Sequence, residues 1–226
     1  MDVEILYHPS DAMAVATLAG GESIQTEAGS MVSMSGGVEI QTQAKGGLLG
    51  GLKRSVLGGE SFFLNTFTAP AQGGNVMLAS SLPGDVRHMQ LTGGTFFLQS
   101  GSYMASSPEV AIDTKWGGAK TFFGGEGLFL LKLDGAGDLI LSSYGAIHQI
   151  DLTAGEEIRV DSGHIVGFAD GINYEVHKVG GWKSTILSGE GLVVGLTGPG
   201  TVYMQTRSPS AFLGWLIPKL PSNNSN

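Results

Sequence analysis

Four short motifs recur in the same order three times along this chain, and this repeat constrains the fold more than any other feature. The first motif reads LAGGESI at 18–24, LTGGTFF at 91–97 and LTAGEEI at 152–158, and the second reads AGSMV at 28–32, SGSYM at 100–104 and SGHIV at 162–166. The third reads GESFF at 59–63, GEGLF at 125–129 and GEGLV at 189–193, and the fourth reads GNVML at 74–78, GDLIL at 137–141 and GTVYM at 200–204. A fixed period indicates one structural unit used repeatedly, which more often builds a surface than a single catalytic pocket.

The repeated unit spans roughly sixty residues. The glycines that open the fourth motif, Gly74, Gly137 and Gly200, are 63 residues apart, whereas the first copy carries a surplus mainly in residues 46–57. A unit of this size is marginal alone, but three copies packed together can bury a continuous core. We therefore expect one compact body with units at 1–80, 81–142 and 143–207, followed by a tail at 208–226.

Composition favours short strands joined by glycine turns. Of the 226 residues, 42% are hydrophobic and 37 are glycine, which is about twice the usual share and shows no Gly-X-Y period. Segments of strand length and strand composition lie at 13–18, 62–67, 75–79, 128–133, 139–141 and 192–196. The sequence therefore predicts an all-β protein, with helix only at 47–57 and 209–216.

Glycine also marks the predicted turns. Gly20-Gly21, Gly93-Gly94 and Ala154-Gly155 occupy the same place in the first motif of each copy. A tight hairpin turn needs positive φ, which glycine adopts at little cost. We therefore expect a hairpin turn at each of the three places.

Charge and cysteine content bound the location and the chemistry. The net charge is −8, and the first 44 residues contain no Lys or Arg, unlike a signal peptide or a mitochondrial transit peptide. No apolar run approaches the ~18 residues that a membrane span needs. The absence of cysteine excludes disulfides, thiol catalysis and cysteine-ligated zinc. We expect a cytoplasmic protein.

Several segments together resemble a known family. They are QTEAGSM at 25–31, GGESFFLNTF at 58–67, FGGEGLF at 123–129 and SGEGL at 188–192. They are similar to the family of the mitochondrial biogenesis protein called "altered inheritance of mitochondria, twenty-four", over about residues 5–207. The resemblance implies three units of the fold of the tryptophan RNA-binding attenuation protein (TRAP), a short double-stranded β-helix. It also implies ring-like assembly, with a homotrimer giving nine units, and supplies no catalytic residues.

A basic residue precedes each Gly-Glu of the third motif. The basic residues are Lys53, Arg54, Lys120 and Lys183, and the acidic ones are Glu60, Glu126 and Glu190. One hypothesis is a ring of equivalent Lys/Glu sites that binds an anion or a partner. The alternative, which we favour, is a set of structural ion pairs between neighbouring strands, worth little where exposed.

Two apolar segments are candidate contact surfaces. The insert at 45–57 carries Leu48 and Leu49 beside basic residues, and suits either a membrane surface or a glycine-rich loop packed on the β body, the interpretation we favour. The tail at 211–217, which includes Trp215, could dock on a neighbouring subunit or on lipid. We expect it to cover the end of its own sheet.

Other functions have weaker support in the sequence. Glu175 and His177 share one face of a strand, and His164 could lie across from them, which is the best metal constellation available. RNA binding would need basic and aromatic residues along a strand edge, but this chain is acidic and its basic residues are scattered. No Gly-x-Ser-x-Gly elbow occurs for a hydrolase.

The sequence thus predicts three tandem TRAP-like units in a non-enzymatic scaffold or interaction protein without a cofactor. Its expected partner is itself, as a homotrimer or larger ring, with a protein partner or a membrane surface as further candidates and nucleic acid disfavoured. The alternative function is binding of a membrane surface, a small ligand or an anion. A metal-dependent enzyme and an RNA binder rank below these two.

Overall fold

The computed structural model describes residues 1–44, 63–114, 129–178 and 192–221. Its first strands are β1 (Asp2–Leu6), β2 (Met13–Leu18), β3 (Ser23–Glu27), β4 (Met31–Met34), β5 (Glu39–Ala44), β6 (Phe63–Thr68) and β7 (Gly74–Ala79). The middle strands are β8 (Val86–Gln99), β9 (Tyr103–Ser106), β10 (Ala111–Asp113) and β11 (Leu130–Ser142). The last strands are β12 (Ile147–Leu152), β13 (Glu157–Asp161), β14 (Ile165–Ala169), β15 (Asn173–Lys178), β16 (Leu192–Thr197) and β17 (Gly200–Gln205).

Helical structure is sparse in the described residues. One α-helix, α3 (Pro209–Leu216), occupies the predicted range, and three short 3-10 helices are present: η1 (Ser100–Ser102), η3 (Ser162–His164) and η4 (Ile217–Lys219). The predicted helix at 47–57 lies outside the described residues. The protein is therefore all-β, as the sequence indicates.

The strand pairing follows one plan in each third of the chain. In the first third, β2 pairs with β7 and β3 with β6, while β4 adds to β7 and β5 to β6. In the last third, β12 pairs with β17 and β13 with β16, while β14 adds to β17 and β15 to β16. In the middle third, the two long strands β8 and β11 pair with each other along nearly their whole length, in place of two separate pairs. Strands β9 and β10 add to β11. The unit boundaries fall between strands and stay a prediction.

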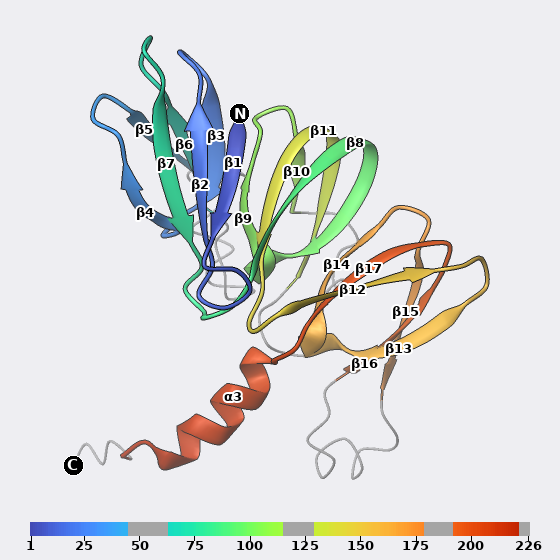
Figure 1. Cartoon of the computed structure of the whole chain (residues 1–226). Helices are drawn as coiled ribbons and strands as arrows, with labels where there is room; N and C mark the ends of the chain where they lie inside the picture. Colours follow the sequence, from blue (N-terminus) through green and yellow to red (C-terminus); the bar gives the residue numbers. More distant parts are fainter. Residues whose placement is uncertain (45–62, 115–128, 179–191, 222–226) are drawn as a thin grey trace.

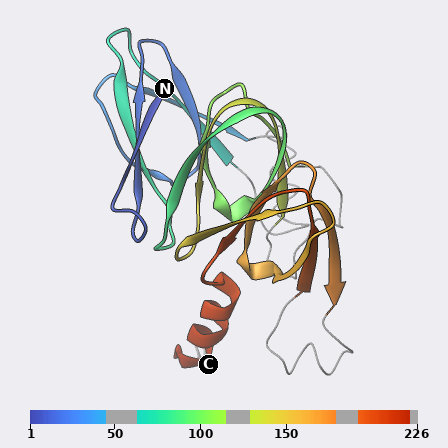
Figure 2. The ribbon, with the colours of Figure 1, turned by 45° about the vertical axis from the view of Figure 1, so that its right-hand side comes forward.

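The three thirds lie in a row, and α3 extends away from the strands (Figure 1). Each third contains a hydrophobic cluster that also takes residues from its neighbour. The first cluster includes Val86 and Ile140 of the middle third, and the last includes Phe97 and Leu130 of the middle third. Neighbouring thirds therefore share core residues. Figure 2 gives a second view of the row.

The glycine turns differ from the prediction. Gly21 and Gly155 have positive φ, but β2 does not pair with β3, nor β12 with β13. The chain turns a corner there from one sheet to another, because a positive-φ glycine redirects the backbone whether or not the flanking strands pair. Gly93 and Gly94 have positive φ too, yet β8 continues through them, and its pairing with β11 shifts register opposite. The three predicted hairpins are therefore wrong.

Candidate functional site

Neighbouring thirds are joined by direct strand pairing. One strand of the middle third and one of the last third each pair with a strand of the preceding part of the chain. At the first junction, β9 pairs with β3, with Ser106 opposite Gln25 and Ala105 opposite Thr26. At the second junction, β14 pairs with β8, with Phe168 opposite Phe97 and Gly167 opposite Leu98. Strand pairing therefore joins each third of the chain to the next.

Most side chains at both junctions are buried. At the first, the Tyr103 hydroxyl lies 2.9 Å from the Ser106 hydroxyl and donates to the carbonyl of Gln25 at 3.3 Å. Burial raises the pKa of Tyr103 well above its usual value, so the hydroxyl stays protonated and can donate. At the second, the Phe97 and Phe168 rings lie 5.2 Å apart. Such contacts stabilise a junction once it is covered.

Strand β4 occupies the same place in the first third as β9 and β14 do in theirs, but it differs from them in burial. Residues of β9 and of β14 up to Phe168 are buried, but every residue of β4 is exposed, including Val32 at 55%. β4 pairs with β7 on one side, and no described strand pairs with its other edge. Met31, Val32 and Met34 therefore form an exposed apolar edge strand, a feature that proteins usually avoid because it invites pairing.

A second open edge lies in the last third of the chain. Strand β13 pairs with β16, and no described strand lies on its other side, where β3 has β9 and β8 has β14. Val160 is buried on this strand, whereas Arg159 is exposed and lies 3.0 Å from Glu157. Within the described residues, β4 thus lacks the neighbouring strand that β9 and β14 have, and β13 lacks the neighbouring strand that β3 and β8 have.

The helix α3 presents a third exposed surface. Ser208 caps it and Pro209 opens it, which explains why it begins there. The centre of the Phe212 ring lies 5.9 Å from that of Tyr144 and 6.2 Å from that of Trp215, and no residue of α3 is buried. The prediction that this tail covers its own sheet is therefore wrong. The helix follows β17, which pairs with β12 on one side and with β14 on the other.

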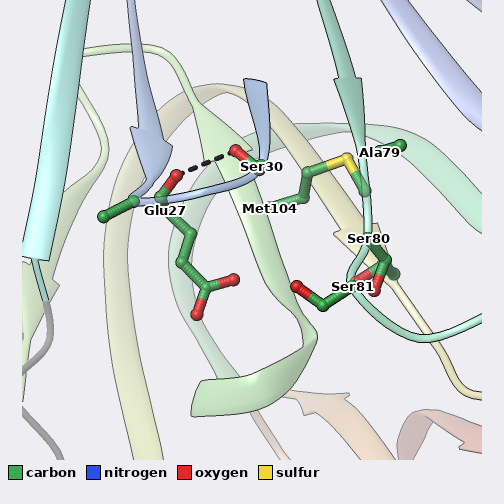
Figure 3. A pocket seen from close by; sticks show the side chains of 8 residues that line it. Glu27, Ser30, Ala79, Ser80, Ser81 and Met104 are labelled. Atoms are coloured by element: carbon green, nitrogen blue, oxygen red, sulfur yellow. Dashed lines mark hydrogen bonds between the residues drawn. The ribbon is translucent and has the colours of Figure 1, made fainter. Parts of the chain in front are cut away.

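A small polar cavity lies where the first two thirds meet. Its volume is about 60 Å³, and Glu27, Ser30, Ser81 and Ser142 are among the lining residues. Figure 3 shows the Glu27 carboxylate and the Ser81 hydroxyl pointing toward each other. Ser30 donates to the Glu27 carbonyl at 2.8 Å. The cavity has room for about two water molecules, far less than a pocket for a drug-sized ligand.

Two histidine–carboxylate pairs join segments that are distant in sequence. His8 Nδ1 lies 2.6 Å from Asp85 Oδ1, and the buried Asp85 side chain also accepts from the Val86 amide at 2.8 Å. His88 Nε2 lies 2.7 Å from Asp138 Oδ1. Sequence reasoning missed both pairs, because their members are 77 and 50 residues apart. Their hydrogen bonds indicate a structural role.

The structure does not assemble the predicted metal constellation. His177 lies 3.7 Å from Glu175, while His164 Nδ1 lies 2.8 Å from the carbonyl of Gln205. Among the described residues, no group of three or more His, Asp or Glu side chains could hold a metal ion. Glu175 and His177 lie two residues apart on one strand, β15, as predicted. His164, however, lies on the 3-10 turn η3 and contacts β17 instead.

Most of the other predicted contact residues lie outside the described residues. These are Leu48, Leu49, Lys53, Arg54, Glu60, Lys120, Glu126, Lys183 and Glu190. The ion-pair hypothesis and the insert hypothesis therefore stay predictions. Trp215 is described, and it is 59% exposed. None of the helices in the described part of the chain is long and apolar enough to cross a membrane.

Comparison with known proteins places the chain in a family. The family model described as mitochondrial biogenesis AIM24 matches residues 3–207. An uncharacterised protein of Streptococcus pyogenes serotype M6 is 29% identical over 216 residues, which cover 92% of this chain and 86% of that protein. A crystal structure of a Streptococcus pyogenes protein matches with a TM-score of 0.81 and 27% identity, over 97% of this chain and 99% of the other. The chain belongs to the AIM24 family of mitochondrial biogenesis proteins.

Proposed function

We propose that the protein is a non-enzymatic scaffold whose copies assemble head to tail through the free edges of β4 and β13. One observation carries the proposal: β4 is an exposed apolar strand in the place where β9 and β14 are buried by a neighbouring third. The assembled form is a homotrimer or a larger ring built from TRAP-like units, three in each chain. Action in the cytoplasm stays a prediction.

The two junctions within the chain define the expected register of the junction between copies. Three residues separate Glu27 from Met31, and the same number separates Gln99 from Tyr103 and Asp161 from Ile165. The strand pairs β3 and β4, β8 and β9, and β13 and β14 can therefore be aligned with one another residue by residue. Applied to the free edges, the pattern pairs β13 of one copy with β4 of the next, with Val160 opposite Ser33 and Arg159 opposite Met34.

The proposed pairing is favourable on physical grounds. It satisfies the unpaired backbone groups of two edge strands, which otherwise form a template for aggregation. It also removes Met31, Val32 and Met34 from water, and fully burying such a side chain contributes about 1.5–3 kcal/mol. A contact between two different surfaces repeats from copy to copy until the rotation closes a ring.

Disulfide cross-linking tests this register directly, because the chain contains no cysteine of its own. In the double variant Met34→Cys/Arg159→Cys, we expect oxidation to give covalent multimers, since paired strands bring Cα atoms within the ~4.4–6.8 Å that a disulfide needs. Each single variant should stay monomeric on a non-reducing gel, because its one cysteine lacks a partner at the junction. Mixing the two single variants should give dimers.

The matched control is Glu4→Cys/Arg159→Cys. Glu4 is exposed on β1, at the opposite edge of the sheet that ends in β4. This variant should give few multimers, although it carries the same number of exposed thiols. Equal cross-linking in both double variants, or none in either, would contradict the proposed junction.

A further inference from the structure

We propose that α3 and η4 bind the surface of an anionic membrane, with the apolar side chains of this segment lying among the lipid headgroups. This goes beyond self-assembly, which uses β4 and β13 at a different place in the fold. It commits to lipid rather than to a second copy of the chain, for reasons of surface chemistry and charge.

The segment is mostly apolar, and none of its residues is buried. Large hydrophobic side chains that exceed one-third exposure occur along its whole length: Phe212, Leu213, Trp215, Ile217 and Leu220. A helix that docks in a protein groove needs only one apolar stripe, whereas a helix that is apolar all round is normally surrounded by protein or lipid. At eight residues, α3 is far shorter than the ~20 residues of a membrane span, so it fits the interface.

Charge favours an anionic surface. Residues 207–221 contain Arg207 and Lys219 and no acidic residue, in a chain whose net charge is −8. Lys219 Nζ lies 5.1 Å from the centre of the Trp215 ring, which places a cation beside an indole. Tryptophan and lysine are the residues that anchor segments at the headgroup level, and each cation near an anionic surface adds attraction.

The position of the segment makes contact with a surface feasible. Figures 1 and 2 both show α3 extending away from the strands, with its far end distant from the β-sheets. Its base is fixed by the Ser208 cap and by the contact of Phe212 with Tyr144. The acidic β body therefore need not approach the lipid. If the chains assemble, several such helices would act together and bind more tightly than one.

Vesicle co-sedimentation tests the inference on the full chain. At low salt, we expect pelleting with vesicles of equal parts phosphatidylcholine and phosphatidylglycerol, and little pelleting with phosphatidylcholine alone. The variant Phe212→Ser/Trp215→Ser should lower the partition constant more than about tenfold, because two aromatic side chains no longer enter the lipid. Lys219→Glu should weaken the preference for anionic vesicles, and raised salt should do the same.

The control is Tyr7→Ser, which removes an aromatic side chain that is 70% exposed in the loop after β1. It should bind vesicles as the unchanged chain does. No pelleting with anionic vesicles at low salt would overturn the inference, as would equal binding by the Phe212/Trp215 variant. A fall in oligomer mass in that variant, without vesicle binding by the unchanged chain, would assign the helix to a second copy instead.

Discussion

Gly84→Ala should lower the free energy of unfolding by about 3 kcal/mol. Gly84 bridges to Gly145, its carbonyl accepts from the Ala12 amide at 2.9 Å, and it therefore lies where all three thirds meet. A Cβ at this position would overlap the carbonyl oxygen of Ser143 and approach the Gly145 amide to 2.8 Å. Backbone atoms cannot rotate aside as a side chain can, so the strands must separate. Urea unfolding followed by circular dichroism measures the effect.

The matched control for this substitution is Gly36→Ala. A Cβ at Gly36 meets no atom within 4 Å, and its φ is not in the positive range that strains alanine. We expect an unchanged or slightly raised urea midpoint, because alanine restricts the unfolded chain more than glycine does. Equal midpoints for the two variants would show that the three thirds do not meet closely at Gly84.

Phe168→Ala should cost about 3–5 kcal/mol of stability. The Phe168 side chain is fully buried and lies 5.2 Å from the Phe97 ring and 5.4 Å from the Tyr174 ring. Truncation would leave a cavity inside the junction between the middle and last thirds, lined by groups that cannot collapse far. The same urea experiment reports the loss as a lower midpoint.

Phe212→Ala is the comparison for this core substitution, because it removes the same side chain from an exposed place on α3. It should change stability by less than about 1 kcal/mol. A small effect at Phe168, similar to that at Phe212, would contradict the close packing of the second junction.

The local features of this fold were predictable from sequence. The strand at 13–18 and the helix at 209–216 have the observed bounds, because alternating apolar residues and a Ser-Pro start are local signals. The corners at Gly21 and Gly155 were wrongly predicted as hairpins, because strand pairing is not a local property. Positive φ is a property of one residue, whereas β2 pairs with the preceding strand β1 and with β7, more than fifty residues away, instead of with β3.

The candidate interface was not predictable in the same way. β4 and β9 have similar lengths and occupy the same place in the repeat, so nothing local distinguishes the exposed strand from the buried one. The difference is set by whether another third lies beside it, which is a tertiary property. The exposure of the tail depends likewise on where α3 lies relative to the strands, which its own sequence does not determine.

Mass in solution by light scattering tests the central claim most directly. We predict a mass that is a whole multiple of 23.4 kDa, with three copies expected. Val32→Lys/Met34→Lys should reduce it to a single copy without unfolding, because both side chains are exposed and the charges would lie in the β4–β13 junction. A single-copy mass for the unchanged chain at micromolar concentration, or a multiple that persists in the variant, would contradict assembly through β4.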